Sequence, residues 1–225
     1  MYPFFKRLFD FLFALTGIII LLPVFVPVII LLLLTGEHEV FYFQQRIGYK
    51  NRVFRIFKFA TMLKNSASIG TGEITLRNDP RVTPMGTFLR RTKLNELPQL
   101  FNVLSGDMSL VGARPLMHKS FDLYPQSVKN LVYRSRPGIT GIGSVVFRDE
   151  EKIISESTDI QAAYRDIFEY KGRLEQWYQQ HFSFYTDFML LFLTGWYIIF
   201  SESELVYKVF RDLPRRRDQV VAARV

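Results

Sequence analysis

The chain has 225 residues, of which 48% are hydrophobic, and this length is enough for one domain with a real core. The composition excludes a disordered tail, and the lack of cysteine excludes disulfides and thiolate metal sites. The formal net charge of +8 favours an anionic partner, which could be lipid head groups, nucleic acid or a phosphorylated substrate.

The first feature along the chain is an uncharged apolar run over residues 11–34, long enough for a helix to cross a bilayer. Basic residues flank it on both sides, and basic flanks are held on the cytoplasmic face. Pro23 and Pro27 lie within the run, where a proline removes a backbone hydrogen bond and kinks a helix. We therefore expect a helix that enters the membrane, breaks and returns, with a through-going span as the alternative. A cleaved signal peptide fits poorly, because the run is too long and no small-residue cleavage pattern follows.

The rest of the chain reads as a mixture of helices and short strands. The expected elements, in chain order, are strands at 41–43 and 53–59 around a turn at 48–51, a loop at 63–80, an interrupted helical region at 82–104, a turn at 112–115, a helix at 121–134, a turn-rich loop at 136–141, a strand at 144–147, a helix at 159–180 and an apolar helix at 188–200. The last is short for a span, and we expect it to be interfacial or part of the core.

These elements predict an α/β fold, mostly helical with short strands, for a monotopic membrane protein with a re-entrant N-terminal helix and interfacial helices. The predicted divisions are a membrane helix at 1–36, a catalytic domain at 37–200 and a basic tail at 201–225. The three arginines at 215–217 favour either contact with anionic lipid or a solvated chain end.

The densest polar block lies between residues 79 and 114 and combines arginines, lysines and carboxylates. Arginine matches phosphate oxygens two at a time, and a carboxylate among cations stays ionised and could hold Mg²⁺. Pro98 predicts a helix start near Asn95 and Glu96, and a helix N-terminus attracts anions. A basic helix face lying on anionic lipid is the alternative, and Asn95 would also serve as an N-cap.

Several ordered segments carry a resemblance to a known family. They are Phe9-Asp10 before the apolar run, 45–48 (QRIG), 58–59 (KF) with 61–62 (TM), 79–83 (DPRVT), 86–92 (GTFLRRT), 95–115 (NELPQLFNVLSGDMSLVGARP) and 136–141 (RPGITG). Over about residues 4–200 the chain resembles the bacterial sugar transferases, the monotopic phosphoglycosyl transferases.

This resemblance implies transfer of a sugar 1-phosphate from a UDP-sugar to a polyprenyl (undecaprenyl) phosphate, with release of UMP. It implies Mg²⁺ as cofactor, held by Glu96, and a bacterial inner membrane enzyme whose catalytic domain faces the cytoplasm on the anionic leaflet. In the family an Asp-Glu pair does the chemistry, and the aspartate forms a covalent phosphosugar intermediate. Here Asn95 stands at the aspartate position.

Three hypotheses follow from Asn95. An active Asn-Glu branch could use Glu96 as the nucleophile, the chain could be a catalytically impaired homologue that still binds substrate, or the lipid phosphate could attack directly. The resemblance also places Arg90, Arg114 and Lys58 at phosphate, Arg136 on the nucleotide side and Asp187 near the active site, where Asp187 could instead cap the last apolar helix. We expect no nucleic acid partner, because the aromatic residues gather in membrane-like segments. The oligomeric state, including a homodimer, stays open.

Overall fold

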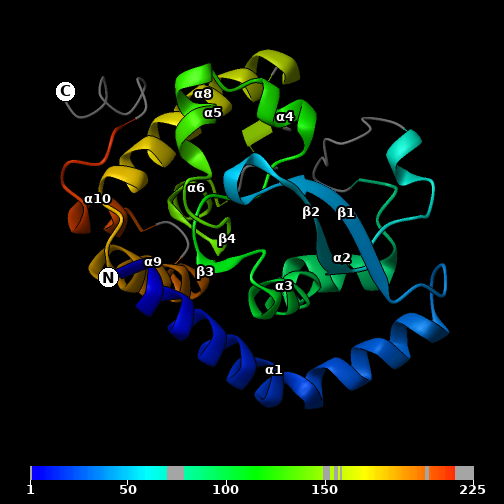
Figure 1. Cartoon of the computed structure of the whole chain (residues 1–225). Helices are drawn as coiled ribbons and strands as arrows, with labels where there is room; N and C mark the ends of the chain where they lie inside the picture. The colour runs from blue at the N-terminus through cyan, green and yellow to red at the C-terminus, as the bar shows by residue number, and fades with distance from the viewer. Residues whose placement is uncertain are drawn as a thin grey trace.

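The computed structural model describes residues 2–69, 79–148, 153–154, 157, 159–200 and 203–215. Within these ranges the protein is mostly helical with short strands, as predicted (Figure 1). The elements are α1 (Tyr2–Leu34), β1 (Phe41–Ile47), η1 (Tyr49–Asn51), β2 (Val53–Phe59), η2 (Ser66–Ser68), α2 (Pro84–Arg91), η3 (Leu94–Glu96), α3 (Gln99–Ser105), β3 (Ser109–Val111), α4 (His118–Asp122), α5 (Gln126–Val132), β4 (Gly138–Thr140), α6 (Ile142–Val146), α8 (Ile160–Gln180), α9 (Phe184–Ile199) and α10 (Leu205–Val209).

The apolar run forms α1, a single helix of 33 residues that contains both Pro23 and Pro27. Figure 1 shows it bent near its middle, with both ends rising toward the rest of the molecule. The helix is thus bent rather than interrupted, as expected where prolines remove backbone hydrogen bonds but the flanking turns stay helical. Among the described residues it is the one helix long and apolar enough to cross a membrane.

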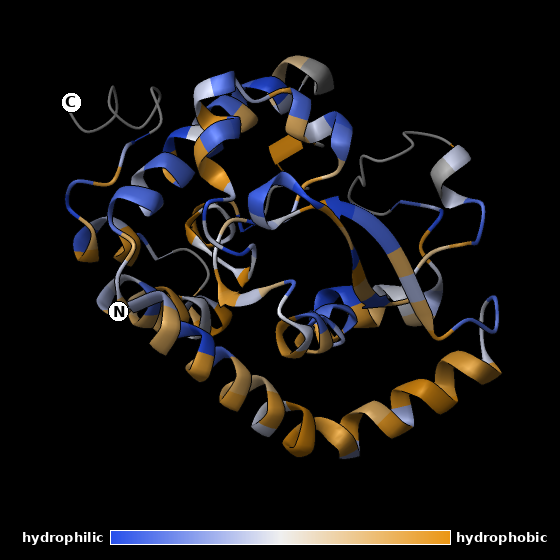
Figure 2. Ribbon diagram, in the orientation of Figure 1, coloured by the Kyte–Doolittle hydropathy of each residue, from blue (hydrophilic) through white to orange (hydrophobic). Residues whose placement is uncertain are grey.

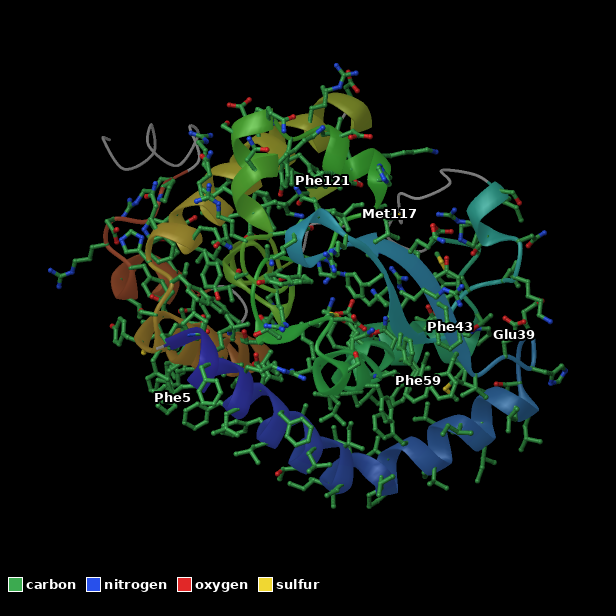
Figure 3. All side chains as sticks on the ribbon, viewed as in Figure 1. Phe5, Glu39, Phe43, Phe59, Met117 and Phe121 are labelled. Carbon is green, nitrogen blue, oxygen red and sulfur yellow. The ribbon has the colours of Figure 1, made fainter. Side chains whose placement is uncertain are left out.

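One side of α1 packs against the body, and the other side leaves large apolar side chains exposed. Phe25 meets the ring of Phe59 from β2 at 5.7 Å between centroids. Figure 3 shows Phe59 between β2 and α1 and Phe5 on the outer side of the helix, and Figure 2 shows the long apolar stretch of α1 in orange. The exposed apolar residues of α1 include Phe4, Phe5, Leu8, Phe9, Leu12, Phe13, Ile19, Ile20, Leu22, Val26, Ile30, Leu33 and Leu34.

The predicted hairpin is confirmed, with β1 extending further than residues 41–43. β1 and β2 pair antiparallel in a register that sets Tyr42 opposite Lys58. The turn between them is tight, and Lys50 and Asn51 adopt positive φ angles of 55° and 57°. The expected loop at 63–80 contains η2, and its residues 70–78 lie outside the described part of the chain.

The strand predicted at 144–147 is wrong. Residues 142–146 form α6, and the strand lies earlier, at Gly138–Thr140, where β4 pairs in parallel with β3. Val145 is buried in a core shared with α8 and α9, so tertiary packing overrides the β propensity of the two valines. The parallel pairing brings Gly112 so close to Gly138 that a Cβ added to Gly138 would meet the Gly112 nitrogen at 2.1 Å.

The C-terminal half covers β3 and β4 with α8 and α9. α8 confirms the predicted polar helix, although it contributes Tyr170, Leu174 and Trp177 to the largest core cluster. α9 begins at Phe184, four residues before the predicted start, because Ser183 caps it by accepting a hydrogen bond from the Thr186 N–H. Val206, Phe210 and Leu213 belong to the same core, so this part of the predicted tail packs on the body; residues 216–225 lie outside the described chain.

Candidate active site

A short turn between α2 and α3 presents Glu96. Thr83 caps α2 by accepting a hydrogen bond from the Gly86 N–H, and Lys93 ends the following turn in the left-handed region with φ of 59°. The chain then forms η3 and enters α3 with Pro98 as its N-cap residue. The helix start predicted near Asn95 and Glu96 lies a few residues later, at Gln99, and those two residues form part of η3 just before α3.

Two cations approach one oxygen of Glu96. Lys58 Nζ from β2 and Arg114 Nη2 from the turn after β3 each lie 3.0 Å from Glu96 Oε1. The side chains of Glu96 and Lys58 are largely buried, at 18% and 15% exposure, whereas Arg114 is 42% exposed. The structure thus brings together three predicted site residues from three separate segments, with Arg114 on the solvent side.

Arg46 adds a third cation beside this cluster. Its Nε donates to Gln44 Oε1 at 3.0 Å and its Nη1 donates to the Pro115 carbonyl at 3.2 Å, which anchors it next to the Arg114 turn. Arg46 was not among the predicted site residues. Its position in the QRIG segment that carried the family resemblance was the available signal.

Burial and the neighbouring charges shift the pKa values of the residues in this cluster. Burial alone would raise the pKa of Glu96, but Arg114 and Lys58 hold that pKa well below its usual value. Burial lowers the pKa of Lys58 to about 8, and nearby Arg114 and Arg46 act in the same direction against the favourable effect of Glu96. Burial, followed by the neighbouring Arg114, lowers the pKa of Arg46 to about 10. Three cations therefore face one ionised carboxylate, and the excess positive charge suits an anionic ligand such as a diphosphate.

Asn95, which precedes Glu96, is buried at 7% exposure. Its Oδ1 has no hydrogen-bond partner among the residues that the structure describes. A buried amide oxygen of this kind is costly, so it is a candidate acceptor for a ligand or a metal-bound water. The N-cap role expected for Asn95 is not observed, since Pro98 occupies that position of α3.

The other predicted site residues occupy other parts of the fold. Arg90 lies in the last turn of α2 and is half-buried. Arg136 donates its Nε to the Gly106 carbonyl at 2.7 Å, and its guanidinium lies 5.1 Å from the centre of the Tyr49 ring. It thus borders the segment that follows α3.

Asp187 instead joins α1 to α8 and α9. It accepts hydrogen bonds from Lys6 and Tyr2 of α1 and from Tyr178 of α8, the last at 2.7 Å. It does not cap α9, because Ser183 does so. These contacts give Asp187 a clear part in docking α1, while its predicted role near substrate stays a prediction.

Tyr133 was not predicted from the sequence to belong to the site. Its buried hydroxyl donates to the Arg114 carbonyl at 2.8 Å and accepts from the Leu116 N–H at 2.9 Å. These two bonds hold the turn that carries Arg114. A lone tyrosine in a helical segment gives no sequence signal for such a role.

The donor chemistry fits Mg²⁺, which prefers oxygen ligands and commonly uses one or two carboxylates together with water and substrate phosphates. Glu96 supplies an ionised carboxylate, and the neighbouring Asn95 supplies a buried amide oxygen that lacks another partner in the described chain. No group of three or more His, Asp or Glu side chains gathers among the described residues.

Comparisons with known proteins identify the family of the chain. The model of the bacterial sugar transferase family matches residues 1–201. An exopolysaccharide production protein, ExoY, of Sinorhizobium fredii is 34% identical over 203 residues, covering 84% of this chain and 83% of that protein. The chain belongs to the bacterial sugar transferase family.

Two longer relatives carry more specific names. One is the UDP-N-acetylgalactosamine-undecaprenyl-phosphate N-acetylgalactosaminephosphotransferase of Aeromonas hydrophila, 35% identical over 86% of this chain. The other is the undecaprenyl-phosphate galactose phosphotransferase of Salmonella typhimurium, 32% identical over 85% of this chain. The chain spans 43% and 40% of their lengths. These names lend no support to the hypothesis of an impaired homologue.

Proposed function

We propose that this protein transfers a sugar 1-phosphate from a UDP-sugar to undecaprenyl phosphate and releases UMP, as the first membrane step of glycan assembly. The observation that carries the proposal is the cluster in which Lys58 and Arg114 pair with the largely buried carboxylate of Glu96, with Arg46 as a further cation beside it. Such a site favours a diphosphate, and the names of the relatives supply the two reactants.

In the proposed reaction an oxygen nucleophile attacks the β-phosphorus, and the bond from this phosphorus to the oxygen shared with the α-phosphorus breaks. UMP leaves with that bonding electron pair. Lys58 and Arg46 would bind the donor's phosphates from the buried side, and Arg114 would bind them from the solvent side. Both roles offset charge that develops on phosphate oxygens in the transition state.

Mg²⁺, when bound through Glu96, would supply further neutralisation of the phosphate oxygens. The carboxylate of Glu96 must be ionised for this, and its lowered pKa provides the ionised form at neutral pH. Asn95 would not act as the nucleophile, because a neutral amide is a poor nucleophile. Beside Glu96 it would instead donate or accept a hydrogen bond with the bound donor.

Two routes remain open for the nucleophile. Glu96 could attack first and form an acyl phosphate that carries the sugar and that the lipid phosphate then cleaves by attack at phosphorus, or the lipid phosphate could attack directly. Incubation with a UDP-sugar labelled in the β-phosphate, without lipid acceptor, separates them. Label retained on the peptide that contains Glu96 indicates the first route, and an unlabelled but active enzyme indicates the second.

The principal test is UMP release from a panel of UDP-sugars by the full chain in lipid nanodiscs with undecaprenyl phosphate and Mg²⁺. We expect release with at least one sugar, and loss of release in Glu96→Gln. Glu39→Gln is the matched control, since the side chain of Glu39 is 47% exposed and, among the residues described, pairs with the exposed Lys64. No release from any UDP-sugar by folded wild-type protein would contradict the proposal, and activity only after Asn95→Asp would favour the impaired homologue.

We also propose that α1 is re-entrant and that α9 lies in the membrane interface at the cytoplasmic face. Support comes from the bend of α1, from its exposed apolar side and from exposed Phe184, Phe188 and Ile199 on α9. A cysteine added before Met1 and Glu39→Cys should both react from the cytoplasmic side only. Reaction of the N-terminal cysteine from outside would indicate a through-going span.

A further inference from the structure

Asn102 of α3 forms two hydrogen bonds with the backbone of β2. Its Oδ1 accepts from the Phe57 N–H at 2.9 Å, and its Nδ2 donates to the Arg55 carbonyl at 2.7 Å. The side chain is buried, at 2% exposure for the residue. One amide thus engages the backbone on both sides of Ile56, as a residue of a parallel neighbouring strand would.

These bonds occupy the edge of β2 that β1 does not cover. The sheet has two strands, so β2 has β1 on one side and α3 on the other. The backbone groups of Arg55 and Phe57 would otherwise lie unpaired next to a helix, where an unsatisfied buried group is costly. Asn102 therefore both completes β2 and fixes it to α3.

Asn102 thus joins β2, which carries Lys58, to α3, which follows the turn that carries Glu96, the ion-pair partner of Lys58. Lys58 directly follows Phe57 on β2, and Glu96 lies in the turn that leads into α3. Because the joint lies one residue from Lys58, a shift of β2 along α3 would move Nζ relative to Glu96 Oε1, now 3.0 Å away. Burial on both partners leaves little freedom for the side chains to compensate.

We propose that Asn102 is a positioning residue that sets the distance between Lys58 and Glu96 by serving as a substitute strand for β2. The inference deepens the proposed function and rests on it. Asn102 does not itself touch the cluster of charges, and its effect on turnover passes through Lys58.

The test uses the full chain in nanodiscs and compares wild type, Asn102→Ala, Lys58→Met and the double variant. Asn102→Ala should lower kcat/KM about 10- to 100-fold, since a displacement of about 1 Å in a reacting site can cost this much. In the Lys58→Met background the same change should matter less than about twofold, because the group through which Asn102 acts is gone. Losses that multiply in the double variant, or a single variant within about twofold of wild type, would overturn the proposal.

Ser105→Ala is the matched control. Ser105 is in the same helix and its hydroxyl donates to the Asn102 carbonyl at 3.0 Å, but it makes no bond to β2 among the described residues. It should leave kcat/KM unchanged. If Asn102→Ala does not fold, Asn102→Asp replaces it in the comparison of single and double variants. Aspartate preserves the shape of the side chain and the acceptor for the Phe57 N–H, and it removes the donor that faces the Arg55 carbonyl.

A second measurement does not depend on turnover. The rate at which the Lys58 amine reacts with a small acylating reagent at one fixed pH, followed by mass spectrometry and compared with the exposed Lys64, reports how accessible Lys58 is. In the wild type Lys58 should react much more slowly than Lys64, because its side chain is 15% exposed and that of Lys64 is 56% exposed. In Asn102→Ala the rate at Lys58 should rise toward that of Lys64, and an unchanged rate would contradict the positioning role. If the wild type releases no UMP, the proposed function fails while this reactivity still decides the role of Asn102.

Discussion

Lys58→Met separates the contribution of Lys58 to the fold from its contribution to the reaction. Methionine keeps the length and apolar stem of the side chain and removes the charge. Lys58 lies 3.0 Å from Glu96, and at an effective dielectric constant of about 20 this attraction amounts to about 5 kcal/mol. A simple reading of the ion pair would therefore predict a large loss of stability.

The pKa of Lys58 indicates instead that the cost of burying the charged amine exceeds its attraction to Glu96. Burial lowers it from 10.5 to about 8, so the folded environment as a whole disfavours the charged amine by about 3 kcal/mol despite the pair with Glu96. Glu96 keeps Arg114 as a partner in the variant. We expect the free energy of unfolding to change between about 0 and +3 kcal/mol, while kcat/KM for the UDP-sugar falls at least about 100-fold.

Thermal and denaturant unfolding of wild type and Lys58→Met in the same nanodiscs measures the first quantity, and UMP release measures the second. Lys64→Met is the control, because Lys64 forms only an exposed pair with Glu39 in the described chain and both quantities should stay unchanged. The wild type should also gain stability as pH rises from about 8 to 10.5, because the unfolded chain then binds more protons than the folded one. A clear loss of stability in Lys58→Met, with activity lost in proportion to unfolding, would refute this reasoning.

Three further predictions concern the same site. The value of kcat/KM should fall as pH rises through about 8, because the free enzyme loses the charge on Lys58, and Lys58→Arg should remove this limb of the pH profile. Tyr133→Phe leaves the Arg114 turn without its two bonds and should lower the free energy of unfolding by about 1–3 kcal/mol with a rise in KM; an unchanged KM would argue against the turn's role. Gly86→Ala should unfold or strongly destabilise the protein in the same unfolding assay, because its Cβ would lie 2.0 Å from the Thr61 carbonyl oxygen.

Local patterns were enough to predict much of the fold and the centre of the site. The prolines and the uncharged run predicted the bent α1, the aromatic and β-branched residues predicted the hairpin, and Pro98 predicted the turn that presents Glu96. Each of these depends on interactions between residues close in the chain, which a single sequence records directly.

The tertiary structure decided the contacts between distant segments. Residues 142–146 form α6 rather than the strand expected at 144–147, because Val145 packs in a core shared with α8 and α9, and no local pattern encodes that choice. The same holds for Arg46 beside Arg114, for Tyr133 on the Arg114 turn and for Asn102 along β2. Sequence alone determined which charged groups exist and which turn carries Glu96. Only the packing of β2 on α3 decided which cations share its carboxylate, because burial and distance, which set both attraction and pKa, arise when the chain closes on itself.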